Sequence, residues 1–459
     1  MSRPLGVVLA ATAVLAAGCT TAEQPRAAKQ KQPVVRTHHV RKVLVTVLDG
    51  DTRRRLRGAI VRIGPHAARS NRAGIAAVPL TRHVSLPVYV SRRGYEKTTV
   101  RVAFARRPQA TVRIYRPELQ WPLYGASPAR TQAQNAIPLR PPFKIIWSRG
   151  LGSLIEFPAV VANGVAYIAN YHGTVRAISM RTGKVAWRHD IPAGKMAASP
   201  AVAGDQVVVH GMDGHVWVFD RRNGRLLWRF AVGSPVESSP VVLDGIDYFG
   251  SWNGRVYALD LRAHRLRWTR NLGYKITSSA ALAGNRVYIG DYGGRIFALA
   301  RGTGRALWVG SVNGRIYGTP AVVGGRVFVP SSDGNSMSAF STSGRLVWRV
   351  NTGGYVYSSP AVWRGRVFFG SYNGVFYCVS ASSGRTLWEV GAGGAVSGAA
   401  VVVDGIAYVG SFGHEITGVD ARSGRVVLRF PHGEYVPVSG SGGTLLLHGF
   451  SRIFAVQPR

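Results

Sequence analysis

A tryptophan recurs at a nearly fixed interval along most of this 459-residue chain, and this period constrains the fold more than any other feature. Its members are spaced by 41, 40, 40, 40 and 40 residues and are Trp187, Trp228, Trp268, Trp308, Trp348 and Trp388. Trp147 lies 40 residues before the series, and Leu428 continues it 40 residues after the last member. A fixed period of this length indicates one repeated supersecondary unit whose neighbours share a continuous core.

Each repeat carries the signals of four short strands. A segment of the Ser-Pro-Ala-Val type opens most units, and an Asn-Gly or Asp-Gly pair such as Asn253-Gly254 follows in mid-unit. Such a pair between apolar runs is the strongest short-range signal of a β-hairpin. Apolar and polar residues alternate with a period of two, which favours strands over helices. Four-stranded units of about 40 residues are typical of β-propeller blades.

The repeats predict an all-β fold with an eight-bladed β-propeller of four-stranded blades over residues 143–459. The proline phase marks units at Pro158, Pro200, Pro240, Ala280, Pro320, Pro360 and Ala400, and a degenerate eighth unit covers 444–456. That last unit has no tryptophan strand after it, whereas a surplus strand ending at Trp147 precedes the first unit. We predict that the surplus strand completes the eighth blade, because a closed ring leaves no open sheet edge.

Two further segments precede the repeats. Residues 42–116 contain short strand-like runs separated by turns, which predicts a small β-sandwich. Its Gly58-Ala59, Gly74 and Gly94-Tyr95 resemble the pattern of carboxypeptidase-regulatory-like and immunoglobulin-like modules, which implies a spacer or adhesion unit. Residues 117–142 form a Pro-rich connector.

The N-terminus has the pattern of an export signal. Residues 1–18 contain Arg3 and then an apolar run too short to span a bilayer permanently. Leu15-Ala16-Ala17-Gly18-Cys19 resembles the lipobox of bacterial lipoproteins, which implies that Cys19 is diacylated and that two acyl chains hold the protein to a membrane. The leucine stands four residues before the cysteine rather than three, so an ordinary secretory signal with an incidental Cys19 stays open.

After the signal, residues 19–41 form a basic flexible tether. No later segment reaches the roughly 18 consecutive apolar residues that a membrane-spanning helix needs. We therefore expect an extracytoplasmic, monomeric protein that is lipid-anchored to the cell membrane or outer membrane.

The repeat from Ser358 to Trp388 resembles those of pyrroloquinoline-quinone-type (PQQ-like) propellers, and Trp121-Pro122, Gly125 and Arg130-Thr131 are similar to the segment that often precedes them. That resemblance implies one of two functions. Some members are quinoprotein dehydrogenases, and others are non-catalytic lipoproteins such as BamB of the β-barrel assembly machinery. The fold alone does not choose between them.

The quinoprotein branch implies bound PQQ, a calcium ion held by carboxylate and amide oxygens, an Asp base and often a vicinal cysteine pair. A hard cation requires several converging oxygen ligands. Among the residues that lie three positions before the periodic prolines, only one is acidic, and the sequence contains no Cys-Cys pair. We therefore expect no PQQ, no calcium, no other metal and no catalytic residue. The side chains at this position that form a candidate axial funnel for a small ligand or peptide are Glu237, Thr277, Tyr317 and Tyr357. The alternative is that they line a water-filled channel.

The charge balance suggests a second surface. The chain has 58 Lys and Arg against 21 Asp and Glu, a formal net charge of +37. Every position three residues before the tryptophan phase is basic, namely Lys184, Arg225, Arg265, Arg305, Arg345, Arg385 and Arg425. The turns between first and second strands add Arg286, Arg326 and Arg366 on the same face. We predict that these ten residues, the basic ring, attract anionic partners.

Such partners are acidic envelope proteins, anionic envelope polymers or an anionic membrane surface. The alternative is that this turn is commonly basic in the family and that an arginine-rich proteome inflates the pattern. Nucleic acid is not expected, because an exported lipoprotein rarely meets it and no groove combines basic and stacking residues. The predicted function is a non-catalytic, membrane-anchored scaffold or envelope assembly factor. The alternatives are a PQQ-dependent dehydrogenase and an adhesion or sensor module.

Overall fold

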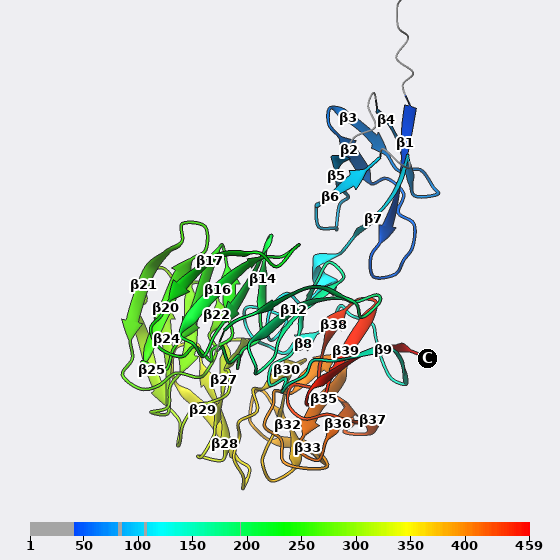
Figure 1. The fold of residues 1–459 in the computed structure, drawn as a ribbon. Helices are drawn as coiled ribbons and strands as arrows, with labels where there is room; N and C mark the ends of the chain where they lie inside the picture. The colour runs from blue at the N-terminus through cyan, green and yellow to red at the C-terminus, as the bar shows by residue number, and fades with distance from the viewer. Residues whose placement is uncertain (1–40, 81–84, 105–107, 193) are drawn as a thin grey trace, which may run out of the picture.

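The computed structural model describes residues 41–80, 85–104, 108–192 and 194–459 (Figure 1). The predicted signal, Cys19 and nearly all of the tether lie outside these residues. Within the described ranges the chain consists of strands and one 3-10 helix, η1 (Pro117–Leu119), which confirms the predicted all-β class. No helix in these ranges has the length and apolar character that crossing a membrane requires.

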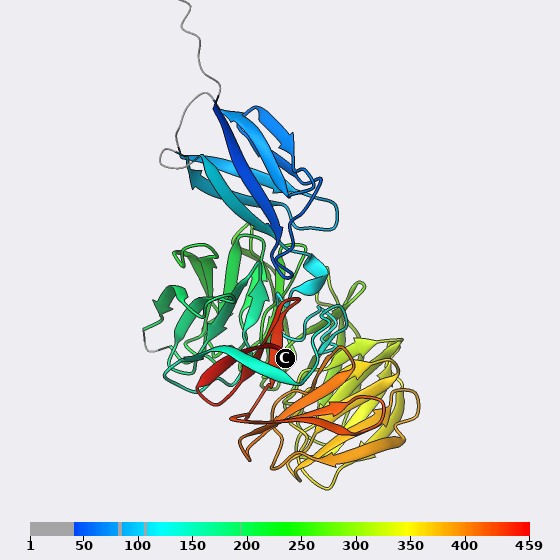
Figure 2. The ribbon, with the colours of Figure 1, turned by 90° about the vertical axis from the view of Figure 1, so that its right-hand side faces the viewer.

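The small N-terminal domain consists of two sheets packed face to face (Figure 2). One sheet has the order β4-β1-β7, with β1 and β7 parallel, and the other has the order β3-β2-β5-β6. Their bounds are β1 (Arg41–Asp49), β2 (Ile60–Ile63), β3 (His66–Arg69), β4 (Ile75–Leu80), β5 (Ser85–Ser91), β6 (Thr98–Ala103) and β7 (Gln109–Ile114). Alternate residues Val43, Val45 and Val47 of β1 are fully buried between the sheets.

The remaining strands form a propeller. Among the described residues, eight sheets each contain four antiparallel strands, and we number these blades 1 to 8 along the chain. The final blade is completed by β9, in which Trp147 pairs with Ala455 of β40. The prediction that the surplus N-terminal strand closes the last blade is therefore confirmed.

The strands of blades 1 to 4 are β10 (Val160–Ala162), β11 (Val165–Ala169), β12 (Thr174–Ser179), β13 (Val185–Asp190), β14 (Ala201–Ala203), β15 (Gln206–His210), β16 (His215–Asp220), β17 (Leu226–Ala231), β18 (Val241–Leu243), β19 (Ile246–Gly250), β20 (Arg255–Asp260), β21 (Arg265–Asn271), β22 (Ala281–Ala283), β23 (Arg286–Gly290), β24 (Arg295–Ala300) and β25 (Ala306–Ser311). Those of blades 5 and 6 are β26 (Ala321–Val323), β27 (Arg326–Ser331), β28 (Ser336–Ser341), β29 (Leu346–Asn351), β30 (Ala361–Trp363), β31 (Arg366–Gly370), β32 (Val375–Ser380) and β33 (Thr386–Gly391). Those of blades 7 and 8 are β34 (Val401–Val403), β35 (Ile406–Ser411), β36 (Glu415–Asp420), β37 (Val426–Pro431), β38 (Val438–Ser441), β39 (Thr444–His448) and β40 (Arg452–Pro458), joined by β8 (Ala133–Gln134) in blade 7 and β9 (Phe143–Gly150) in blade 8.

The periodic tryptophan ties each outer strand to the next blade. The indole Nε1 of Trp268 donates a hydrogen bond of 2.8 Å to the carbonyl of Arg301, in the turn before the outer strand of the following blade. Gly304 of that turn lies against the indole, and a Cβ there would stand 2.5 Å from the ring. Where His264 replaces this glycine, the ring of Trp228 stacks on the imidazole at 4.5 Å and its Nε1 has no acceptor. The repeated Gly-Arg-x-x-Trp pattern therefore reflects a contact between neighbouring blades, in which the tryptophan of one blade packs on the glycine of the next.

The serine before the periodic proline links the inner strands. The backbone N–H of Ser199 donates to Oγ of Ser239 at 3.0 Å, and that of Ser239 donates to Oγ of Ser279 at 2.8 Å. Between blades 8 and 1, Nε2 of His448 accepts from the N–H of Ala159 at 3.2 Å. These bonds are buried, so each one is worth more than an exposed hydroxyl contact.

The connector crosses the axis of the propeller and bonds to every blade. Its backbone pairs with or accepts from blades 1, 2, 4, 5, 6, 7 and 8, through Trp121 with Val161, Pro122 with Val202, Pro128 with Leu282, Ala129 with Val322, Thr131 with Val362, Gln132 with Val402 and Leu119 with Gly442. Blade 3 is reached by the Arg130 side chain. The connector thus closes one end of the axial channel.

Arg130 is 1% exposed and has backbone carbonyls as its partners. Its Nε donates to Ala280 at 2.9 Å, and its Nη2 donates to Ser239 at 2.9 Å and Pro240 at 3.0 Å. A further hydrogen bond runs from Nη1 to the carbonyl of Tyr124. Burial lowers the pKa of Arg130 to about 10, which leaves it charged at neutral pH. Four carbonyl dipoles take the place of a carboxylate partner.

Candidate functional site

The four predicted funnel residues come together at the axis. Glu237, Thr277, Tyr317 and Tyr357 line one cavity, on the loops that connect successive blades. Tyr124 of the connector also lines this cavity, and its hydroxyl bonds Ser359 at 3.1 Å. The connector therefore covers the inner end of the funnel. Its volume is about 30 Å³, whereas a single water molecule requires roughly 10–15 Å³ of such space.

Two carboxylates share the funnel with a phenol. Tyr317 donates to Oε1 of Glu237 at 2.6 Å, and Oε1 of Glu156 lies 3.3 Å from the same hydroxyl. Oε2 of Glu237 accepts from the indole of Trp252 at 2.9 Å. Burial, together with the charge of Glu237, raises the pKa of Glu156 to about 7. Burial and the two carboxylates also raise the pKa of Tyr317, so the phenol stays protonated and donates.

These residues do not fit pyrroloquinoline quinone and calcium. Both oxygens of Glu237 already accept hydrogen bonds, and burial favours the neutral form of Glu156. Among the residues that the structure describes, no three His, Cys, Asp or Glu side chains gather as a metal site requires. Cys378 is buried in β32 and has no vicinal cysteine.

Aromatic side chains surround the opening of the funnel, and we call this group the aromatic mouth. Its members lie on the turns between second and third strands and on the loops between blades, and are Tyr171, Trp252, Tyr274, Tyr292, Tyr317, Tyr355, Tyr357, Tyr372, Phe412 and Tyr435. A continuous series of ring contacts runs from Tyr317 to Tyr357 (5.2 Å), Tyr372 (5.0 Å), Phe412 (5.7 Å) and Tyr435 (5.5 Å between centroids). The series joins the last four blades.

A repeated backbone bond holds the mouth in place. The N–H of the first turn residue donates to the carbonyl of the inter-blade loop, as from Trp252 to Pro235 (3.0 Å) and from Tyr372 to Tyr355 (2.9 Å). Trp252 is nevertheless 36% exposed, Tyr274 55% and Tyr355 47%. Sequence reasoning missed this surface, although the signal was present as an aromatic residue after the polar end of the second strand.

Cations lie over several of these rings. Nζ of Lys275 is 3.3 Å from the ring centroid of Trp252 and 4.9 Å from that of Tyr292. Nζ of Lys195 lies 5.5 Å from the centroid of Tyr171. Burial lowers the pKa of Lys275, while the charge of Glu237 opposes that shift. Tryptophan and tyrosine side chains on a rigid frame are typical of the central contacts of protein interfaces.

The basic ring lies on the opposite face. Lys184 and Arg225, Arg265, Arg305, Arg345, Arg385 and Arg425 are exposed on the turns before the outer strands. Arg286, Arg326 and Arg366 are half-buried instead. Arg286 donates to the carbonyl of Thr342, and Nη1 of Arg366 lies 3.9 Å from Sγ of Cys378. Within the described residues none of the ten forms an ion pair.

The sequence profile of the family described as outer membrane protein assembly factor BamB matches residues 144–279, 252–355 and 335–450. The chain belongs to this family. The BamB protein of Taylorella asinigenitalis is 35% identical over 72 residues, which are 16% of this chain and 19% of that protein. The quinoprotein ethanol dehydrogenase of Pseudomonas aeruginosa is 36% identical over 80 residues, 17% of this chain and 13% of that enzyme. The matches therefore span less than a fifth of these relatives.

Solved structures share the BamB-family fold at low identity. BamB from Moraxella catarrhalis has a TM-score of 0.58 and 18% identity, with 69% of this chain and 97% of that chain covered. The quinohemoprotein alcohol dehydrogenase of Comamonas testosteroni has a TM-score of 0.62 and 12% identity, with coverages of 74% and 80%. At these identities the likeness shows the fold and not the activity. The predicted PQQ-like, BamB-like propeller is confirmed.

Proposed function

We propose that this BamB-family protein is a non-catalytic scaffold of the cell envelope, anchored to a membrane through Cys19, whose aromatic mouth binds other envelope proteins. The aromatic mouth is the observation that carries the proposal. Trp252, Tyr274 and Tyr355 are exposed and the other rings are half-buried. Cations lie over several rings, and backbone bonds fix the turns before any partner arrives. Preorganised aromatic anchors lose little conformational freedom on binding, which favours affinity.

The position of the small domain orients this surface. Two turns of the propeller contact the small domain, on the face that carries the basic ring. Gly164 of blade 1 lies against Tyr115, and Gly443 of blade 8 lies against Asp51. The chain enters the domain at the end far from the propeller (Figures 1 and 2). A lipid at Cys19 would therefore place the aromatic mouth on the side away from the anchor.

The same arrangement bears on the partner of the basic ring. β1 spans nine residues, which is about 30 Å of extended strand. Electrostatic attraction between exposed charges is screened beyond about 8 Å at physiological salt. A small domain of this length holds the basic ring away from the anchoring membrane when the molecule stands upright. We therefore favour acidic envelope proteins or polymers as its partners.

The test compares two exposed tyrosines. A photocrosslinking amino acid is placed at Tyr355 of the aromatic mouth and, as a matched control, at Tyr89 of the small domain, which is 48% exposed. We expect defined envelope-protein adducts from position 355 and not from position 89, and loss of those adducts when Trp252→Ala is added. Equal capture at both positions, or capture insensitive to Trp252→Ala, would contradict the proposal.

The dehydrogenase alternative has its own test. The purified protein is incubated with pyrroloquinoline quinone and Ca²⁺, and dye reduction is followed with alcohols and sugars. Because the funnel lacks the set of oxygen ligands that calcium requires, we expect no activity above that of the free cofactor. Turnover that depends on Glu237 would overturn the assignment.

A further inference from the structure

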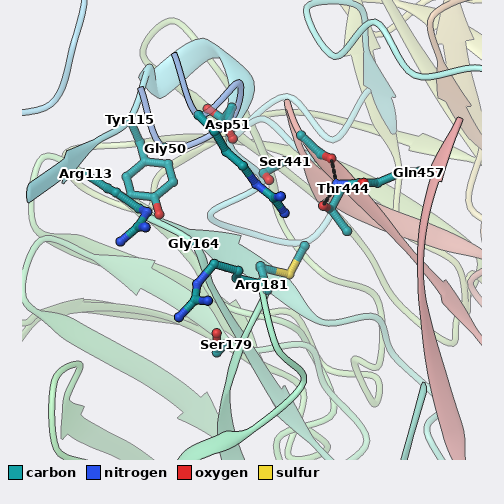
Figure 3. A pocket seen from close by; sticks show the side chains of 13 residues that line it. Gly50, Asp51, Arg113, Tyr115, Gly164, Ser179, Arg181, Ser441, Thr444 and Gln457 are labelled. Carbon is teal, nitrogen blue, oxygen red and sulfur yellow. Dashed lines mark hydrogen bonds between the residues drawn. The ribbon is translucent and has the colours of Figure 1, made fainter. Parts of the chain in front are cut away.

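A second cavity lies between the small domain and the propeller (Figure 3). It has a volume of about 210 Å³, several times that of the axial funnel. Its walls come from the end of β1, the end of β7 and turns of blades 1 and 8. Its lining includes Asp51, Arg53, Arg113, Tyr115, Arg181 and Ser441. Neither the funnel nor the aromatic mouth contributes to it.

Glycines allow the two domains to meet closely here. A Cβ at Gly164 of blade 1 would stand 2.1 Å from the hydroxyl of Tyr115 at the end of the small domain. A Cβ at Gly443 of blade 8 would stand 2.2 Å from the carbonyl oxygen of Asp51. The small domain therefore packs closely against the propeller here, and the cavity is part of that interface.

Four side chains that line the cavity, the exposed Arg53, Arg113 and Arg181 and the half-buried Tyr115, have no acceptor among the residues that the structure describes. Arg53 and Arg113 come from the small domain, Arg181 comes from blade 1, and the Tyr115 hydroxyl lies between them. Figure 3 shows Tyr115 pointing toward Gly164, with Arg113 and Arg181 beside it. In the described part of the chain, none of these four side chains has a hydrogen bond or ion pair of its own. Burial raises the pKa of Tyr115 to about 12, so its hydroxyl stays a donor.

One of the arginines is held by a fixed turn. The carboxylate of Asp49, 1% exposed, accepts from the N–H groups of Asp51 and Thr52 at 3.0 and 2.9 Å. The N–H of Arg53 bonds the carbonyl of Asp49 at 2.9 Å, and Arg53 has a φ of 61°, in the left-handed region. This turn directs Arg53 to the cavity.

The geometry points to a binding site for a phosphate group, held by Arg53, Arg113 and Arg181 at the junction of the two domains. Guanidinium groups bind phosphate oxygens in pairs, and a donor set without acceptors is suited to an anion. Asp51 is the one carboxylate of the lining. Its side chain bonds Gln120 at 3.2 Å, and burial raises its pKa to about 6, which weakens its opposition to an anion below that pH.

A free phosphate and the phosphate of a lipid headgroup would bind through the same groups, so the experiment has two arms. The full chain with Cys19→Ser, which carries no acyl anchor, is titrated with radiolabelled inorganic phosphate at constant ionic strength in equilibrium dialysis. In parallel it is sedimented with phosphatidylglycerol–phosphatidylcholine vesicles. The variant is Arg113→Gln with Arg181→Gln. The control is Arg72→Gln with Arg101→Gln, which removes the same charge from exposed positions of the small domain that belong neither to the cavity nor to the basic ring.

We expect saturable binding of one phosphate group per chain, weakened at least tenfold in the cavity variant and less than twofold in the control. Binding in the dialysis arm identifies a soluble phosphate, and binding in the vesicle arm alone identifies a headgroup. Absence of binding in both arms would overturn the inference, as would equal weakening by the control pair. Circular dichroism and the urea midpoint establish that each variant is folded.

Discussion

Gly304→Ala is the substitution for which the structure gives the clearest expectation. Gly304 has a φ of 70°, and a Cβ there would stand 2.5 Å from the indole of Trp268. The left-handed backbone costs an L-residue about 1–2 kcal/mol. Forcing the methyl group into a packed contact adds about 1–3 kcal/mol. We therefore expect the free energy of unfolding to fall by about 2–5 kcal/mol in total.

Gly204 is the matched control. It lies in a turn of blade 2 with a φ of 59°, and a Cβ there would meet nothing within 4 Å. Gly204→Ala should therefore lower the free energy of unfolding only by the cost of the left-handed backbone, about 1–2 kcal/mol. Urea unfolding followed by far-UV circular dichroism measures both variants.

A double-mutant cycle isolates the contact itself. When Trp268→Leu removes the indole, the methyl group at position 304 has room, so the two substitutions should be coupled by about 1–3 kcal/mol. Equal losses at Gly304 and Gly204, or strictly additive effects of Trp268→Leu and Gly304→Ala, would refute the reasoning that this contact joins the blades.

Three further outcomes follow from buried groups. Glu156 has a folded pKa of about 7 against 4.5 for the free group, so the folded state loses stability as pH rises through that window. The free energy of unfolding of Glu156→Gln should therefore equal that of wild type at pH 4 and exceed it by up to about 3 kcal/mol at pH 8. Parallel pH profiles of the two proteins would contradict this. Burial raises the pKa of Cys378 to about 11, so in the Cys19→Ser chain a disulfide reagent at pH 8 should react only after unfolding, and rapid native labelling would disagree. Arg130→Met should lower the free energy of unfolding by about 3–5 kcal/mol and expose the connector to proteolysis, because four carbonyls lose their donor. Arg140→Met, at an exposed position of the same connector, should change both only a little.

The repeat made much of the fold predictable. Equivalent positions recur every 40 residues, so a residue type repeated in one phase must occupy the same place in each blade. This reasoning brought Glu237, Thr277, Tyr317 and Tyr357 to one wall and gave β9 its place beside β40. The strand signal is weaker in β4, Ile-Ala-Ala-Val-Pro-Leu, because alanine and proline are depleted in strands.

The features outside the repeat were harder to foresee. The path of the connector depends on backbone carbonyls such as those of Pro122 and Pro128, which leave no mark in the sequence. Arg286 was placed with the exposed cations, but its side chain crosses to the turn of Thr342 in the next blade and bonds its carbonyl. The interdomain cavity joins residues more than 300 positions apart, such as Arg113 and Ser441, and no local pattern connects them.

The connector also has a mechanical consequence. Any tension applied at the N-terminus passes through the small domain and then into a segment that is bonded to all eight sheets, rather than into a single peripheral strand. Load is thereby divided among many short bonds acting near the centre, and no individual sheet is peeled away first. A protein pulled between a lipid and a bound partner would resist unravelling for this reason.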